Sequence, residues 1–221
     1  MKELFPGIFE NHGKLCTRNL VPGKRIYGEK LFHENGFEYR IWNSFRSKLS
    51  GAIRNKLEDV PLQAGSTVLY LGISEGTTAG HISDIIGLEG VIFGIDVSEQ
   101  TMKKLIGICE TRTNIIPILA DANQPENYKE YLEGFEVDLI YMDVSQKNQV
   151  EILQKNAGCY LSKNGKAMLC LKLKSISSTQ PIQEIIDNAE LELKQHFKIL
   201  QVLDLKPFDK DHRFYLLEKK G

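Results

Sequence analysis

The chain has 221 residues, and its 42% hydrophobic content is enough to bury one substantial core. The 28 Lys and Arg residues nearly balance the 29 Asp and Glu residues, so a formal charge of -1 excludes a general attraction to nucleic acid. The four cysteines form no Cys-x-x-Cys pair, which argues against zinc and disulfide frameworks, and no apolar run reaches the ~18 residues of a membrane span.

Glycines punctuate the first part of the chain, where short β-like pieces occur at 25–27 and 37–40. We expect a small β domain over residues 1–42, packed directly on the rest because no flexible linker follows. Ser44 is then predicted to cap a helix that runs through Lys56. Its apolar face would contain Phe45, Leu49, Ile53 and Leu57, with Lys48 beside it.

From residue 67 onward, short apolar runs alternate with helix-length segments. The runs lie at 67–71, 91–95, 115–120, 137–142, 166–172, 200–205 and 214–218. This spacing is typical of βαβ units and a largely parallel sheet, and the closeness of the last two runs indicates an antiparallel pair at the sheet edge. The predicted fold class is α/β: a Rossmann-like class I methyltransferase fold over residues 43–221, with a seven-stranded, mostly parallel sheet and an antiparallel last strand.

The first run ends at Gly72, and Gly76, Thr77 and Thr78 follow it. Asp96 closes the next run, where a carboxylate can accept hydrogen bonds from both hydroxyls of a ribose. A third glycine, which a dinucleotide site would need, is missing, so the pattern favours S-adenosylmethionine. An ordinary strand-to-helix turn remains an alternative for the glycine pair alone.

Acids also follow the next two runs of the sheet. Asp121 would contact the adenine amino group, and Asp143 would lie near the methionine end of the cofactor. Each acid is also a possible helix N-cap. Lys172 ends the fifth run, where Asp143 is an available partner; alternatively its side chain extends to water.

Two windows contain cations and no acids. The first holds Arg40, Arg46, Lys48, Arg54 and Lys56, and the second holds Lys155, Lys163, Lys166, Lys172 and Lys174. Such windows are often solvated faces of two elements, but they would form a local basic patch if they met in space.

Several longer motifs carry a resemblance to a known family. They lie at 17–23, 27–30, 39–49, 69–72, 76–78, 112–118, 121–122, 143–146 and 207–212. With these motifs the sequence resembles fibrillarin, the S-adenosylmethionine-dependent RNA 2′-O-methyltransferase of box C/D guide ribonucleoproteins, over nearly its whole length. The resemblance is to the short archaeal form, which implies a cytoplasmic location, or a nucleolar one if the source is eukaryotic.

The resemblance implies a set of site residues. Lys48, Asp143, Lys172 and His212 correspond to the catalytic residues. The cofactor would be bound by Gly72, Thr77, Thr78, Asp96, Val97, Asp121, Ala122, Asp143, Val144, Ser145 and Gln146. No metal is expected. The implied partners are a Nop-family scaffold protein, a kink-turn-binding protein, the box C/D guide RNA and a substrate rRNA or tRNA.

The sequence departs from the family pattern near the cofactor. Glu75 stands in place of a small residue, Val97 in place of an aromatic one, and Lys147 in place of proline. A lost stacking surface at Val97 and a negative charge at Glu75 would both weaken cofactor binding. Two alternatives therefore stay open: methylation of protein glutamine, and a structural subunit of the ribonucleoprotein that binds cofactor poorly.

Overall fold

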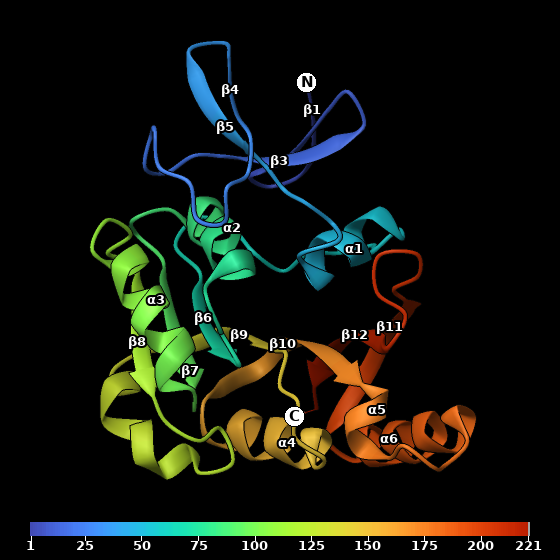
Figure 1. The fold of residues 1–221 in the computed structure, drawn as a ribbon. Helices are drawn as coiled ribbons and strands as arrows, with labels where there is room; N and C mark the ends of the chain where they lie inside the picture. The colour runs from blue at the N-terminus through green and yellow to red at the C-terminus, as the bar shows by residue number, and fades with distance from the viewer. Residues whose placement is uncertain (221) are drawn as a thin grey trace.

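The computed structural model describes residues 1–220, in which a small N-terminal sheet is seated on a larger α/β domain (Figure 1). The small sheet is antiparallel throughout, with the order β1-β2-β3-β5-β4. Its strands are β1 (Lys2–Phe5), β2 (Ile8–Asn11), β3 (Lys14–Arg18), β4 (Leu31–Glu34) and β5 (Phe37–Ile41).

The strand predicted at 25–27 is wrong. These residues form a loop around Glu29, whose carboxylate accepts the backbone N–H groups of Ile26 and Tyr27 at 2.9–3.2 Å. A local side-chain acceptor thus replaces the ladder partner that a strand would need. The division into domains at residue 42 remains a prediction.

A buried polar network joins the small sheet to helix α2 (Thr77–Ile86). Arg40 of β5 donates to one carboxylate oxygen of Asp84 at 2.8 Å, and Arg112 donates to the other at 2.6 Å. Both guanidinium groups are almost fully buried. Pulling the small sheet away from α2 would leave buried charges without partners, which is costly, so this network holds the small sheet on α2. The small sheet thus packs directly on the rest of the chain, as expected from the lack of a flexible linker.

The larger sheet has seven strands in the order β11-β12-β10-β9-β6-β7-β8. They are β6 (Thr67–Leu71), β7 (Val91–Asp96), β8 (Ile115–Leu119), β9 (Val137–Met142), β10 (Leu161–Lys172), β11 (Phe197–Asp204) and β12 (His212–Lys219). Six strands run in one direction and β12 runs in the opposite direction, which confirms the predicted sheet. β11 and β12 form the expected antiparallel pair at one edge of the sheet, with β11 outermost, and β10 begins five residues earlier than expected.

Alternate residues of the central strands point to opposite faces of the sheet. Val68 and Tyr70 pack in one core with α1 (Lys48–Arg54), α2 and α3 (Glu99–Cys109), whereas Leu69 and Leu71 pack in the other. The second core includes η1 (Pro125–Leu132), α4 (Gln149–Cys159) and α6 (Ile182–His196), and α5 (Leu173–Ile176) lies on the same side (Figure 1). The result is a three-layer sandwich. No helix among residues 1–220 has the length and apolar character needed to cross a bilayer.

Helix α1 (Lys48–Arg54) is shorter than predicted. Ser47, and not Ser44, is its N-cap, because the Ser47 hydroxyl accepts the backbone N–H of Ser50. Phe45 therefore precedes the helix and is 70% exposed, while Leu49 and Ile53 are buried as expected. The shorter helix places Lys48 in its first turn.

Candidate active site

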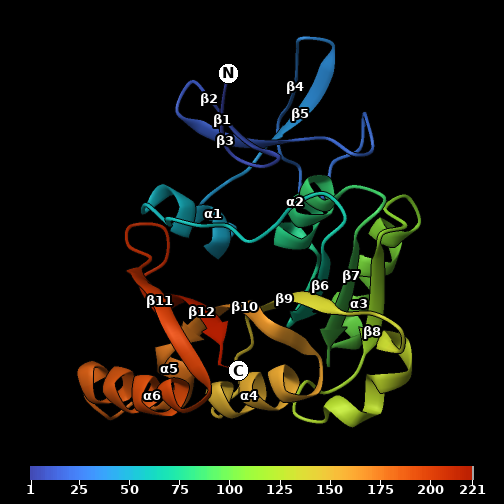
Figure 2. The ribbon, with the colours of Figure 1, turned by 180° about the vertical axis from the view of Figure 1, so that it is seen from behind.

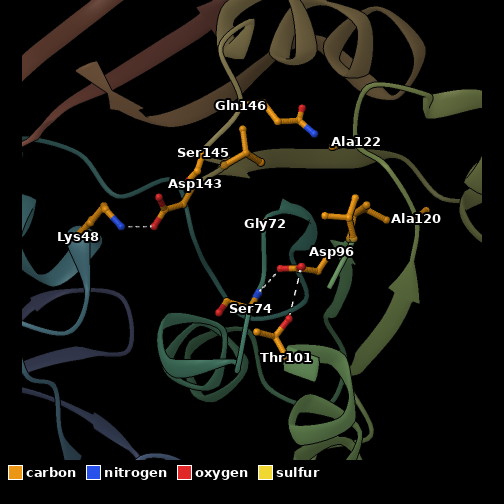
Figure 3. A pocket seen from close by; sticks show the side chains of 13 residues that line it. Lys48, Gly72, Ser74, Asp96, Thr101, Ala120, Ala122, Asp143, Ser145 and Gln146 are labelled. Carbon is orange, nitrogen blue, oxygen red and sulfur yellow. Dashed lines mark hydrogen bonds and ion pairs between the residues drawn. The ribbon is translucent and has the colours of Figure 1, made fainter. Parts of the chain in front are cut away.

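A cavity of about 470 Å³ opens at the carboxyl edge of the larger sheet (Figure 3). Residues from α1 and from the ends of β6, β7, β8 and β9 line it. The predicted cofactor residues among its lining are Gly72, Asp96, Val97, Ala122, Asp143, Val144, Ser145 and Gln146. Parallel strands end at one edge of a sheet, and this is why residues so far apart in sequence meet here.

Gly72 lies where β6 ends and the backbone turns with φ of +81°. A Cβ atom at this position would lie 2.3 Å from the carbonyl oxygen of Asp143. Glycine is therefore required both for the left-handed conformation and for the close approach of two backbone segments. Gly72 thus brings the ends of β6 and β9 together beside the cavity that both line.

Asp96 ends β7 and is oriented by backbone donors. One carboxylate oxygen accepts the N–H of Ser74 at 2.8 Å (Figure 3), and the other accepts the N–H of Ser98 at 2.9 Å. Ser98 is the N-cap of α3, so Asp96 is not merely a helix cap. Because each carboxylate oxygen can accept more than one hydrogen bond, Asp96 can also bind hydroxyls of a ligand in the cavity.

Two departures from the family pattern have different surroundings. Val97 lines the cavity with 59% of its surface exposed, so an aromatic stacking surface is indeed missing there. Glu75 does not line the cavity and forms an ion pair with Lys104 of α3. The negative charge expected to oppose the cofactor is therefore paired and is not part of the cavity lining.

Asp121 does not line the cavity, although Ala120 and Ala122 on either side do. Its carboxylate accepts the backbone N–H of Asn123 at 2.9 Å and the side-chain amide of Gln146 at 3.2 Å. The contact of Asp121 with adenine stays a prediction, and the structure shows only that its side chain is not part of the cavity lining. Asp121 orients Gln146, and Gln146 lines the cavity.

Thr77 and Thr78 begin α2 but do not line the cavity. The Thr78 side chain is buried and its hydroxyl donates to the hydroxyl of Ser47 at 2.9 Å. The structure therefore does not bring these two hydroxyls to a ligand in the cavity. Thr78 instead links α2 to the N-cap of α1 and so supports the turn that carries Lys48.

Lys48 and Asp143 form an ion pair at one end of the cavity (Figure 3). The Lys48 ammonium donates to Asp143 at 2.6 Å, and about four-fifths of each side chain is shielded from solvent. Lys48 comes from the first turn of α1 and Asp143 directly follows β9. The pair is thus built from two elements whose positions the fold fixes.

Lys172 does not pair with Asp143, contrary to the prediction. Its ammonium donates to the hydroxyl of Ser145 at 3.2 Å. Gln149 holds the backbone of Lys172 through two hydrogen bonds, at 2.8 and 3.1 Å. Lys172 lies at the end of β10 directly opposite His212, the first residue of the antiparallel strand β12.

His212 completes the group at this edge. Its Nδ1 lies 2.8 Å from a carboxylate oxygen of Asp209, and its Nε2 lies 4.0 Å from Asp143. The structure therefore gathers Lys48, Asp143, Lys172 and His212 around one strand edge, with Asp143 between Lys48 and His212.

The protonation states of this group follow from burial and charge. Burial is the largest single influence on Lys48 and opposes its charged form, but the charge and the hydrogen bond of Asp143, together with other nearby groups such as Asp209, raise the pKa of the ammonium above its usual value. Burial and then the nearby Lys48 cation lower the pKa of His212, although Asp209 and Asp143 oppose this shift. At neutral pH Lys48 is therefore a cation and His212 is neutral.

A smaller cavity of about 120 Å³ lies on another side of the same ion pair. Lys48 and Asp143 line both cavities. The smaller one is further bounded by Phe45, Arg46 and Thr78, and by Phe208 and Asp209 from the loop between β11 and β12. The ion pair thus borders two cavities, an arrangement that would let it face a cofactor in one and an acceptor in the other.

The two basic windows do not form one continuous patch. Arg40 is buried, and several other members are paired with acids: Arg54 with Glu10, Lys166 with Asp59, Lys155 with Glu151 and Lys174 with Asp211. The windows contribute to the site through Lys48, Lys172 and Arg46, which lines the smaller cavity.

Sequence reasoning missed Ser74, Ile95, Thr101 and Ala120 in the lining of the larger cavity. Ser74 lies two residues beyond Gly72 with a positive φ of 52°, and its place in the glycine loop is a signal that could have found it. Thr101 is placed by the first turn of α3, for which the sequence pattern gives no specific signal. Among residues 1–220, no cluster of three or more His, Cys, Asp or Glu side chains is placed to hold a metal.

Comparisons with known proteins agree with this geometry. The family model described as Fibrillarin matches residues 1–220. A protein of Pyrococcus abyssi named fibrillarin-like rRNA/tRNA 2′-O-methyltransferase is 44% identical, over 99% of this chain and 97% of the relative.

Two solved structures are also similar to the chain. Aeropyrum pernix fibrillarin, solved with natively bound S-adenosyl-L-methionine, superposes with a TM-score of 0.90 at 38% identity, covering 98% of this chain and 96% of that one. A fibrillarin from a fibrillarin/Nop5p complex superposes with a TM-score of 0.90 at 37% identity, covering 99% of this chain and all of the other.

Proposed function

The chain belongs to the fibrillarin family, and we propose on that basis that it is the catalytic subunit of a box C/D guide ribonucleoprotein. It transfers a methyl group from S-adenosylmethionine to a ribose 2′-hydroxyl of rRNA or tRNA. The observation that carries this proposal is the ion pair of Lys48 and Asp143, which borders both the larger cavity and a smaller one.

The residues of the larger cavity fit S-adenosylmethionine. Asp96 would accept hydrogen bonds from the ribose, Val97 and Gln146 would lie at the adenine, and Gly72 and Asp143 at the methionine end. When bound, this cofactor supplies a methyl group that its sulfonium already activates for displacement. The protein itself must align the attacking oxygen and help to remove its proton.

Lys48 acts as a cation in the proposed reaction. Because its pKa is raised, the ammonium keeps its proton and stabilises the negative charge that develops on the ribose oxygen. Asp143 holds the ammonium in place through the 2.6 Å hydrogen bond. Lys172 has no carboxylate partner within ion-pair distance among residues 1–220 and contacts the Ser145 hydroxyl instead. We assign the removal of the ribose proton to Lys172, in the amine form that it reaches by releasing its own proton to solvent.

The partners follow from the same proposal. A net charge of -1 gives this chain little affinity of its own for phosphate, so the guide RNA and proteins bound to it must position the substrate. A Nop-family scaffold protein is the direct partner, and the fibrillarin/Nop5p complex supports this choice. A kink-turn-binding protein completes the particle. We place the particle in the cytoplasm, as the archaeal relatives suggest.

Two experiments distinguish RNA methylation from the two alternatives, which are methylation of protein glutamine and a structural subunit that binds cofactor poorly. Labelled S-adenosylmethionine is given to the assembled complex with guide-matched RNA, or with a glutamine-containing protein substrate. Label in RNA alone is the expected result, and label in the protein alone would support glutamine methylation. Calorimetric titration with S-adenosylmethionine tests the cofactor-poor alternative. We expect clear binding, because Glu75 is paired with Lys104 and does not line the cavity.

A further inference from the structure

Phe45 is an exposed aromatic residue that the proposed reaction does not yet use. Its side chain is 70% exposed, and its ring lies 5.2 Å from that of Phe208 in an edge-to-face arrangement, measured between ring centroids. Both rings border the smaller cavity, together with Lys48 and Asp143. An aromatic pair therefore flanks the space from which an acceptor hydroxyl must approach the ion pair.

The segment that presents Phe45 is held in place. The side-chain oxygen of Asn43 accepts the backbone N–H of Phe45 at 2.9 Å, and the hydroxyls of Ser44 and Ser50 lie 2.8 Å apart. The Ser47 cap of α1 follows directly. These contacts fix the backbone on both sides of Phe45, so its ring is presented on a rigid turn.

The loop that carries Phe208 is fixed against α1. Figures 1 and 2 show the connection between β11 and β12 beside α1 from both sides. Asn55 donates its side-chain amide to the carbonyl oxygens of Asp204 and Lys206 at 2.7 and 2.8 Å. A Cβ atom at Gly51 would lie 3.2 Å from Cβ of Phe208, so the aromatic residue packs closely on the helix.

The segments that carry this aromatic pair also carry cations, although Asp209 borders the same cavity and Arg46 lies 5.2 Å from the centre of the Tyr27 ring. Arg46 lines the smaller cavity, and exposed Lys206 and Lys210 lie on the loop that carries Phe208. Within residues 1–220, no carboxylate lies within ion-pair distance of Arg46 or Lys210. Aromatic rings beside unpaired cations are the combination that binds single-stranded RNA, by base stacking and by phosphate contact.

We propose that Phe45 and Phe208 form a stacking platform for a base of the substrate RNA next to the ribose that is methylated. This inference rests on the proposed RNA methyltransferase function. Phe45 is then a positioning residue: stacking on its ring holds the nucleotide so that the 2′-hydroxyl reaches Lys48 and Asp143. Its place beside the reacting groups favours RNA over a protein partner as the occupant of this surface.

The test uses the complex assembled with scaffold protein and guide RNA. Phe45→Ala should lower the single-turnover rate by roughly 5- to 150-fold, the range expected for one lost stacked base. The S-adenosylmethionine dissociation constant should stay unchanged. Phe45→Trp should keep the rate, whereas Phe45→Leu, which is apolar but has no ring, should not. Phe37→Ala is the matched control, because Phe37 is an exposed ring on the small sheet.

A fluorescent base gives a second measurement that does not depend on turnover. With 2-aminopurine next to the target nucleotide, stacking should quench the emission in the wild-type complex and in Phe45→Trp, but not in Phe45→Ala. Wild-type rates for Phe45→Ala and Phe45→Leu, or loss of scaffold binding in Phe45→Ala, would overturn the stacking platform alone. A wild-type complex that fails to methylate guide-matched RNA would overturn the proposed function instead.

Discussion

The Lys48 ammonium lies 2.6 Å from a carboxylate oxygen of Asp143, although 95 residues separate the two in sequence. The short helix α1 provides one partner and the end of β9 provides the other. Because the pair borders both cavities, it fixes where a methyl group and its acceptor can meet. The two lysines therefore differ in their contacts. Asp143 holds Lys48 as a cation, whereas Lys172 is not paired with a carboxylate.

This difference predicts different responses to arginine. Lys172→Ala should lower turnover by roughly 10²–10⁴-fold, the range for loss of a proton-transfer group, and Lys172→Arg should not restore it because guanidinium keeps its proton. Lys48→Arg should retain part of the activity that Lys48→Ala loses, because only a cation is needed there. Single-turnover methylation by the assembled complex measures both pairs. Full activity in Lys172→Arg would show that Lys172 is not the base.

Gly72→Ala should abolish cofactor binding. The new Cβ would lie 2.3 Å from the carbonyl oxygen of Asp143, so the ends of β6 and β9 must move apart. Gly65→Ala is the matched control, because Gly65 has a similar φ of +83° but open space around its Cβ. It should cost only about 1–2 kcal/mol of folding stability from left-handed strain and leave binding intact. Titration with S-adenosylmethionine and urea denaturation are carried out on both variants. Equal cofactor affinity and equal stability in Gly72→Ala and Gly65→Ala would show that the close approach of β6 and β9 is not needed for binding.

Asp96→Ala should weaken S-adenosylmethionine binding by about 1.5–3 kcal/mol, because the ribose hydroxyls lose a charged acceptor. Asp96→Asn keeps the shape of the side chain and should show a smaller loss. Calorimetry gives both dissociation constants. An Asp96→Ala variant that folds and binds as tightly as the wild type would exclude this residue from the ribose site.

The sequence was sufficient for features that depend on local periodicity. Gly72, Asp96 and Asp143 could be assigned to one site because each follows an apolar strand and parallel strands end at one edge. Pairings between side chains were not accessible in this way. Lys172 was expected to pair with Asp143, but Lys48 from the first turn of α1 occupies the carboxylate, and the Lys172 ammonium contacts Ser145. Thr78 was likewise expected at the ligand, but its hydroxyl donates a hydrogen bond to the hydroxyl of Ser47.

Folding stability should fall in mild acid through His81. Its ring nitrogens lie 2.8 Å from the hydroxyls of Thr17 and Tyr27. Burial, and then Arg40 and Arg112, hold its pKa well below the ordinary 6.5. Below about pH 6.5 the unfolded chain binds a proton that the folded chain does not, so stability is lost at up to about 1.4 kcal/mol per pH unit. Urea melts at several pH values should show a shallower slope for His81→Gln, and an equal slope would count against this cause.

We propose that the methyl acceptor is a ribose 2′-hydroxyl positioned next to Lys48 and Asp143. Its most direct test is single-turnover methyl transfer by the assembled complex to two guide-matched RNAs that differ only at the target nucleotide. One carries ribose there and the other carries 2′-deoxyribose. We predict labelled methyl in the ribose RNA and none at that nucleotide in the deoxyribose RNA. Equal labelling of both RNAs would contradict the claim, because the methyl group would then be attached to another atom.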